Sequence, residues 1–260
     1  IVKTLHGKAR RQIGTSGAGN HFVEFGIVHI SDPENEFSIP PGKYLGLLSH
    51  SGSRGLGAGI AAYYTKVASD KCKLPAVAKN LAWLDMSSQE GAEYWLAMNL
   101  AGDYAAACHD QIHKKIGKSL GISLAARIEN HHNFAWKELY EGKEVIVHRK
   151  GATPAGKGVL GIIPGSMVQP GYIVRGTGAE ISVNSASHGA GRKMSRAQAK
   201  NAITQKMLKD MLKKHQVELL GGDIDEAPQA YKDIETVMHS QKKLVEIIGT
   251  FHPKIVRMDG

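Results

Sequence analysis

Hydrophobic and polar residues follow one another in patterns that predict a mixture of strands and helices. Runs of β-branched and aromatic residues predict strands, and the chain has nine such runs: 22–30, 44–48, 122–129, 145–148, 158–163, 172–175, 179–184, 244–248 and 254–257. The run at 145–148 is the return strand of a hairpin over 136–150, which turns at Glu141-Gly142. Strands of this length need other elements to cover them, so a larger sheet is expected.

Helical periodicity is strongest in four segments. Helices are predicted over 57–72, from Ser87-Ser-Gln-Glu90 to about Ile116, over 195–215 and over 228–241. Ser87 and Ser195 each precede a Glu or Gln by three residues, which is typical of a capping box. The strands and helices do not alternate regularly. The pattern therefore predicts an α+β fold in which residues 1–260 form a single compact domain, with a mixed β-sheet core flanked by helices.

Charge changes this picture by indicating a partner. The chain has 33 Lys and Arg against 24 Asp and Glu, a net charge of +9 and a pI of about 9.4. This excess favours a polyanion as partner, although a soluble protein can also be basic without one. No apolar run is long enough to cross a bilayer, so no membrane partner is expected. Cys72 and Cys108 lack the spacing of a disulfide or zinc framework, which predicts reduced thiols in a cytoplasmic protein.

Candidate chemistry is concentrated in Ser185-Ala-Ser-His188-Gly-Ala-Gly-Arg192. Backbone N–H groups of a glycine-rich loop that leads into a helix can bind an anion, and Arg192 adds a guanidinium that fits phosphate. A histidine beside bound phosphate can act as nucleophile, general acid or metal ligand. The alternative is an ordinary glycine turn with a solvated histidine.

Three further loops place a histidine beside Gly, Ser or Asn at the end of a predicted strand. They contain His21, His50 and His132. Strand ends of one sheet can meet at one edge, so these loops and His188 could form one site. Neutral imidazoles suit a first-row divalent metal, and histidines without a carboxylate or thiolate favour zinc. A single histidine of this kind is more often a core or turn residue than a ligand.

Cations beside glycine turns predict phosphate binding. Arg54, the Arg149-Lys150 pair and the Arg192-Lys193 pair all have this setting. By contrast, the lysines between Lys206 and Lys214 repeat along one predicted helix. That pattern is typical of a solvated face, with nucleic-acid contact as the alternative.

Taken together, these loops resemble the RtcB family of RNA-splicing ligases over essentially the whole chain. The resemblance rests on six motifs in the family's order: Gly19-Asn20-His21-Phe22-Val23-Glu24, His50-Ser51-Gly52-Ser53-Arg54-Gly55, His132-Asn133, Arg149-Lys150-Gly151-Ala152-Thr153, Pro164-Gly165-Ser166-Met167 and His188-Gly189-Ala190-Gly191-Arg192. Each motif alone is weak, whereas six in this order are specific.

The resemblance implies an RNA ligase that uses GTP and Mn²⁺ to join a 3′-phosphate or 2′,3′-cyclic phosphate RNA end to a 5′-hydroxyl end. It implies that His188 carries GMP, and that His21, His50 and His132 are metal ligands. The positions it assigns to the nucleotide are Asn20, Glu24, Lys150, Pro164, Gly165, Ser166, Met167, Gly189, Ala190, Gly191 and Arg192. Arg54 and Arg192 match positions near phosphate or RNA. The resemblance also implies tRNA halves or cleaved RNA as substrates and an activating protein partner.

The sequence departs from the family pattern in three places. The family's upstream Asp-x-x-Cys metal motif, expected well before Gly14, is absent, so the N-terminal metal-ligand segment is missing from this sequence. Pro164–Met167 is followed by Val168-Gln-Pro-Gly171, where the family has Gly and, three residues later, Ser. The family's final Lys-Gly is replaced by Asp259-Gly260. The last two changes bear on base preference.

These departures leave two alternatives open. One is a catalytically incomplete RNA-binding fragment, whose RNA affinity would fall steeply with salt. The other is a metal-dependent phosphohydrolase that uses the same histidines without a covalent nucleotide. Labelled GTP distinguishes both from a ligase.

Overall fold

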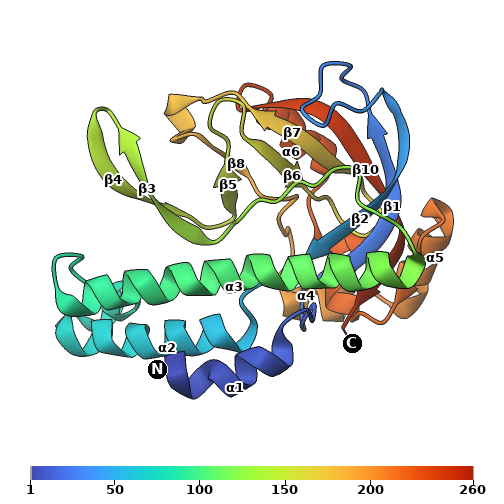
Figure 1. Ribbon diagram of the computed structural model, residues 1–260. Helices are drawn as coiled ribbons and strands as arrows, with labels where there is room; N and C mark the ends of the chain where they lie inside the picture. The colour runs from blue at the N-terminus through green and yellow to red at the C-terminus, as the bar shows by residue number, and fades with distance from the viewer. Residues whose placement is uncertain (1, 260) are drawn as a thin grey trace. The chain divides into compact units, whose positions relative to one another are not determined.

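The computed structural model describes residues 2–259 (Figure 1), so both ends of the predicted 1–260 domain lie outside the described residues. Contacts divide the chain into two compact units. One comprises residues 1–17 and 49–123, and the other comprises residues 18–48 and 124–260. The α+β prediction is confirmed, because helices accompany a sheet whose strands are mostly antiparallel. The two units are described one at a time.

The smaller unit is helical. It contains α1 (Val2–Gln12), α2 (Arg54–Lys71), the 3₁₀ turn η1 (Ala76–Leu81) and α3 (Gln89–Leu120). Leu56 and Ile60 of α2 pack with Ala97 and Ala101 of α3, and Ala9 joins them from α1. Small residues on α3 allow close packing of these helices. The helix predicted over 57–72 is α2, which begins three residues earlier than expected, at Arg54.

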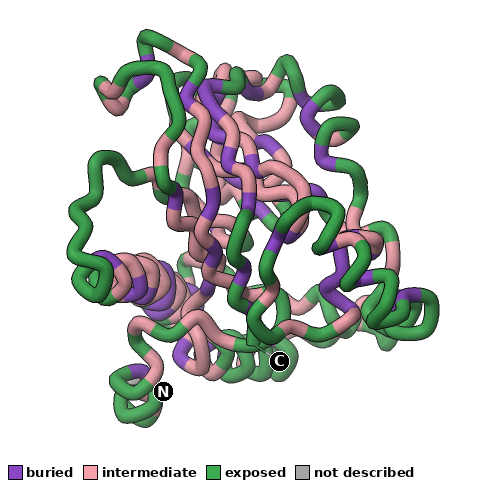
Figure 2. The backbone as a smooth tube through the Cα atoms, turned by 90° about the vertical axis from the view of Figure 1, so that its right-hand side faces the viewer, coloured by how far each residue is buried: buried purple, intermediate pink, exposed green. Residues whose placement is uncertain are grey.

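The larger unit is built on a six-stranded mixed sheet. The strand order is β2-β1-β10-β7-β6, and β9 pairs in parallel with β10. The strands are bounded as follows: β1 Phe22–Ile30, β2 Gly42–His50, β6 Leu160–Ile163, β7 Gly171–Gly176, β9 Glu218–Leu220 and β10 Val245–Met258. Figure 2 shows that buried residues are concentrated along these strands. The prediction of a mixed sheet is confirmed.

Two short two-stranded sheets complete the larger unit. The predicted hairpin over 136–150 is confirmed as β3 (Phe134–Tyr140) and β4 (Lys143–Arg149), which turn at Glu141 and Gly142. The second sheet pairs β5 (Ala152–Pro154) with β8 (Ser185–Ser187). This pairing joins chain segments that the sequence did not indicate as partners.

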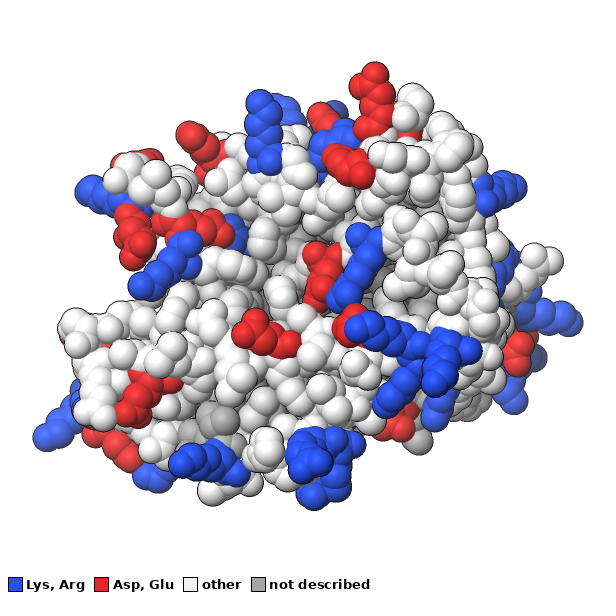
Figure 3. All heavy atoms as spheres, in the orientation of Figure 1, with Lys and Arg blue, Asp and Glu red and all other residues white. Residues whose placement is uncertain are grey.

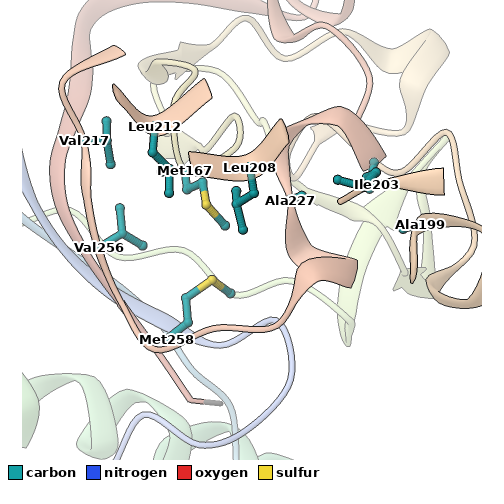
Figure 4. Close-up of a cluster of buried hydrophobic side chains, with 10 residues drawn as sticks. Met167, Ala199, Ile203, Leu208, Leu212, Val217, Ala227, Val256 and Met258 are labelled. Carbon is teal, nitrogen blue, oxygen red and sulfur yellow. The ribbon is translucent and has the colours of Figure 1, made fainter. Parts of the chain in front are cut away.

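Helices α4 (Arg196–Ala202) and α5 (Gln205–His215) of the larger unit pack against one hydrophobic cluster. Leu208 and Leu212 of α5 pack against Met167, Val256 and Met258 (Figure 4). The lysines of α5 are exposed, as expected for a solvated face. Helix α6 (Ile234–Ser240) packs its buried Ile234 and Met238 in a second cluster.

Several predicted elements were wrong at their boundaries. The predicted 195–215 helix is two helices, because Ile203 is extended and Thr204 caps α5 by accepting from the Met207 amide. The predicted 228–241 helix is a 3₁₀ turn, η4 (Pro228–Ala230), followed by α6, which Asp233 caps. The cap of α3 is Ser88, not Ser87, whereas the capping box at Ser195 is confirmed.

Two predicted strands were also wrong, and two others are parts of one strand. Residues 122–129 form no strand, and residues 180–182 form a 3₁₀ turn, η2 (Glu180–Ser182). Val183 and Asn184 then take left-handed conformations, so the strand begins only at Ser185. The runs at 244–248 and 254–257 are one strand, β10, with a register shift between Ile247 and Gly249. Apolar content alone did not distinguish a turn from a strand at 180–182.

Candidate active site

His188 follows β8 directly, and the β5–β8 pairing places it beside Gly151. Ala152 pairs with Ser187, and the His188 amide donates to the Gly151 carbonyl at 3.3 Å. Gly151 has a φ of +68°, which favours glycine, and a Cβ there would lie 3.9 Å from the His188 ring. Two motifs that are 37 positions apart in the sequence thus meet at one histidine.

The imidazole of His188 stacks on that of His132. The ring centroids are 4.9 Å apart and the planes differ by 22°. The Nδ1 atom of His188 is buried and has no hydrogen-bond partner within the described part of the chain. A buried polar atom without a partner is rare and indicates a place where a ligand can supply the missing contact. This nitrogen is the strongest local indication of a binding site.

The loop after His188 packs on the Pro164–Met167 turn. The Ala190 amide donates to the Pro164 carbonyl at 3.1 Å. Ser166 Oγ is another buried atom without a hydrogen-bond partner among the described residues. The Met167 side chain, however, belongs to the hydrophobic cluster with Met258 (Figure 4), so only its backbone could face a nucleotide. The turn and the His188 loop are therefore adjacent, as a nucleotide site at these motifs requires.

Arg192 is held by protein groups. Its guanidinium donates to the Met194 and Asp225 carbonyls at 3.1 and 2.6 Å and forms an ion pair with Glu226 at 3.2 Å. The same guanidinium lies 5.2 Å from the centroid of the Tyr231 ring. These contacts fix the end of the His188 loop. The contacts give this side chain a positioning role. Phosphate binding by Arg192 stays a prediction.

Arg149 anchors the segment that leads to Lys150 and Gly151. Its guanidinium is buried and donates to both carboxylate oxygens of Glu138, at 2.6 and 2.8 Å. It also donates to Ser185 Oγ at 2.8 Å and lies over the Trp136 ring. Lys150 itself is exposed. The adjacent cations therefore differ in role: Arg149 joins three elements, and Lys150 is accessible to a ligand.

The first motif lies at the start of β1. Asn20 is exposed and His21 is half-buried, whereas Glu24 is buried in the strand. Burial raises the pKa of the Glu24 carboxyl to about 8, because the charged form is poorly solvated there. Glu24 is consequently mostly protonated at pH 7 in the absence of a ligand.

His50 and Arg54 belong to the helical unit. His50 ends β2, and Arg54 begins α2 with a φ of +53°. The Arg54 guanidinium donates to Thr15 Oγ1 at 3.3 Å, and Ser51 Oγ donates to the Ser16 carbonyl at 2.6 Å. These contacts attach the glycine-rich segment around Gly14 to the start of α2. Their roles toward metal and RNA stay predictions.

A metal site is not assembled within the described residues. Over positions 2–259, no group of three or more His, Cys, Asp or Glu side chains is placed to hold an ion. His21, His132 and His188 share the larger unit, but His50 does not. The predicted ligand set is also made only of imidazoles, whereas Mn²⁺ favours oxygen donors.

Sequence reasoning missed residues that position the site. Gln241 is buried, and its Oε1 accepts from the Ser187 amide at 2.8 Å. Asn130 Oδ1 accepts from the Ile162 amide, and its Nδ2 donates to Thr153 Oγ1. Neither residue lies in a motif with a recognisable spacing to His188. Only a long-range pairing of the strands could have identified them.

The surface and helices add two findings. Figure 3 shows Lys and Arg spread over the face that it presents, with Asp and Glu among them. Within residues 2–259, no helix has both the length and the apolar composition that crossing a bilayer requires.

Known proteins resemble this chain over most of its length. The family model described as tRNA-splicing ligase RtcB matches residues 1–259. RNA-splicing ligase RtcB1 of Escherichia coli is 35% identical over 92% of this chain and 59% of its own length. The tRNA-splicing ligase RtcB of Nanoarchaeum equitans is 32% identical over 98% of this chain and 61% of its own. The chain therefore spans about 60% of the length of these relatives.

Proposed function

This chain belongs to the RtcB family, and we propose that it is an RNA ligase that joins 3′-phosphate or 2′,3′-cyclic phosphate ends to 5′-hydroxyl ends through a guanylylated His188. The observation that carries the proposal is the buried, unpartnered Nδ1 of His188. This ring stacks on the His132 ring and directly precedes the glycine-rich loop 189–191. A nucleophile adjacent to anion-binding backbone is what nucleotidyl transfer needs.

The proposed joining reaction consists of three substitutions at phosphorus, and each forms one bond and breaks another. The neutral imidazole of His188 attacks the α-phosphorus of GTP, which forms a P–N bond and releases pyrophosphate as the α–β bond breaks. A 2′,3′-cyclic end is first opened by water, which breaks the bond from phosphorus to O2′ and leaves a 3′-phosphate and a 2′-hydroxyl. An oxygen of the RNA 3′-phosphate then attacks the phosphorus bound to His188, so GMP passes to the RNA and His188 regains its lone pair. The 5′-hydroxyl finally attacks the activated 3′-phosphorus, loses its proton and displaces GMP. Each step is an in-line substitution at phosphorus.

The residues of this chain supply orientation for these steps. The Gly151 carbonyl holds the His188 amide, and the His132 ring restricts the His188 ring to one plane. In the proposal, the exposed Gly191 offers its backbone to phosphate oxygens, whereas the Ala190 N–H is engaged with the Pro164 carbonyl, so Gly189 and Ala190 shape the loop. Buried Ser166 Oγ, Lys150, Asn20 and Glu24 contact the nucleotide. A fixed nucleophile lowers the entropy cost of reaching the transition state.

The remaining assignments follow from family membership. His21, His50 and His132 are proposed ligands of Mn²⁺, with water supplying the oxygen donors that this ion favours, and Arg54 and Arg192 are proposed contacts of phosphate or RNA. Substrates are tRNA halves or cleaved RNA in the cytoplasm, and an activating partner protein belongs to the same proposal. The names of the relatives support RNA as substrate.

The test is incubation with GTP labelled at the α-phosphate and Mn²⁺, followed by denaturing electrophoresis. We expect a label on the protein that acid removes and alkali does not, because a phosphoramidate is acid-labile. His188→Ala should abolish the label, while His215→Ala, an exposed histidine at the end of α5, should retain it.

The other outcomes distinguish the alternatives. Label that persists in folded His188→Ala contradicts the assigned nucleophile. Absence of label together with RNA binding that weakens steeply with salt indicates an incomplete RNA-binding fragment. Hydrolysis of phosphate esters without label indicates a phosphohydrolase. Label from ATP instead of GTP places the base preference with Val168–Gly171 and Asp259.

A further inference from the structure

Two histidines of α3 converge on one serine within the helical unit. His109 and His113 are four residues apart, so they lie on the same face of the helix. Ser49 Oγ lies 2.7 Å from His109 Nδ1 and 2.9 Å from His113 Nε2. All three residues belong to the unit of residues 1–17 and 49–123. None of them is among the residues that the resemblance assigns to a site.

The hydrogen-bonding pattern shows that the two ring nitrogens face a common point. A serine hydroxyl has one proton, so it can donate to only one of the two nitrogens, and the other nitrogen must donate to it. The two rings are therefore oriented with respect to each other by a shared neighbour that lies within 2.9 Å of both nitrogens. Convergent imidazoles of this kind are the usual starting geometry for a metal site.

We propose that His109 and His113 bind a zinc ion, with Ser49 Oγ and water completing its coordination. Zinc takes histidine nitrogens at about 2.0–2.1 Å, so small side-chain rotations suffice to bring both nitrogens to one ion. Pairs of histidines at positions i and i+4 of a helix bind zinc in the H-E-x-x-H motif. Here the corresponding sequence is His109-Asp-Gln-Ile-His113.

The chemistry of the ligands favours zinc over manganese. Imidazole nitrogen suits zinc, whereas manganese prefers oxygen and binds most weakly in the Irving–Williams order. Asp110, between the two histidines, forms an ion pair with Lys114 at 2.8 Å. Its carboxylate is therefore already engaged, and the two nitrogens dominate the site.

Bound zinc would connect the end of β2 to α3. Ser49 is the residue before His50, so the ion would restrain the backbone that presents His50. The proposal does not depend on ligase activity, since it concerns only the affinity of this unit for a metal.

The experiment is a zinc titration of the metal-free full chain by isothermal calorimetry. We expect the wild type to bind one more zinc ion than the double variant His109→Gln, His113→Gln, and each single variant to lose at least tenfold in affinity at this site. His215→Gln is the matched control, because it removes an exposed helical histidine elsewhere, and it should bind as the wild type does. Folding of each variant is checked by circular dichroism.

Three results would overturn the proposal. The first is an unchanged zinc stoichiometry and affinity in the folded double variant. The second needs no variant: wild-type crystals soaked in zinc should give an anomalous peak between His109 and His113, and a map without that peak excludes the site. A tenfold excess of Mn²⁺ should leave the zinc in place, and its displacement contradicts the assignment to zinc.

Discussion

Glu24 provides the sharpest test of the electrostatics, because its carboxyl is buried in β1. Burial raises its pKa from an ordinary value of 4.5 to about 8. Between these values the folded chain holds a proton that the unfolded chain has lost, so the free energy of unfolding falls as pH rises. At 1.36 kcal/mol per pKa unit, this costs the folded protein about 3 kcal/mol at pH 7 and about 1 kcal/mol at pH 5.

Glu24→Gln removes the ionisation but keeps the shape of the side chain. We therefore expect the variant to be more stable than the wild type, and we expect the difference in unfolding free energy to grow by about 2–3 kcal/mol from pH 5 to pH 7. Urea unfolding at pH 5, 6, 7 and 8 measures this difference by linear extrapolation. Glu218→Gln, an exposed glutamate of β9, is the control and should show no comparable trend.

A constant difference between Glu24→Gln and wild type over this range would refute the reasoning. It would mean that the Glu24 carboxylate is solvated or paired in the folded protein. A difference that grows as pH falls would contradict even the sign, because a carboxyl with a lowered pKa stabilises the folded state above its unfolded pKa and loses that effect on acidification.

Two further substitutions test the supports of the His188 loop. Arg149→Met leaves the Glu138 carboxylate without its bidentate partner, so we expect the free energy of unfolding, measured with urea, to fall by about 3 kcal/mol. A decrease below about 1 kcal/mol would show that water replaces the arginine. Gly165→Ala places a Cβ 2.6 Å from the Pro170 carbonyl, so the turn must shift. We expect a lower melting temperature and weaker guanylylation of His188 in this variant, and full labelling would contradict the role of the turn.

The sequence was sufficient to predict most strands. The strand at 22–30 and the hairpin at 136–150 have local signals, namely β-branched runs and an intervening Glu-Gly turn. The segment 179–184 has similar apolar content but folds as a 3₁₀ turn. Its left-handed Val183 is stabilised by contacts from elsewhere, since Arg149 donates to the Val183 carbonyl at 3.1 Å. Propensity cannot predict a conformation that a distant side chain imposes.

The same limit explains which site residues could be found from sequence. His188 stands out because it lies within a run of glycines, and that context is visible without a structure. Its supports do not stand out: Gln241 is 54 residues away from the Ser187 amide that it accepts from, and Arg149 is 36 residues from Ser185. These contacts arise only once β5 pairs with β8.

The distribution of these contacts has a consequence for the chemistry. A glycine-rich loop is flexible by itself, so a nucleophile within it would lose catalytic power to conformational entropy. Here the Gly151 carbonyl, the Gln241 amide side chain and the ion pair of Arg192 with Glu226 restrain the loop from three sides. Only Gly191 of the loop 189–191 is exposed, and distant residues provide the rigidity. A substitution at Gln241 should therefore change the reactivity of His188, even though the two residues lie far apart in the sequence.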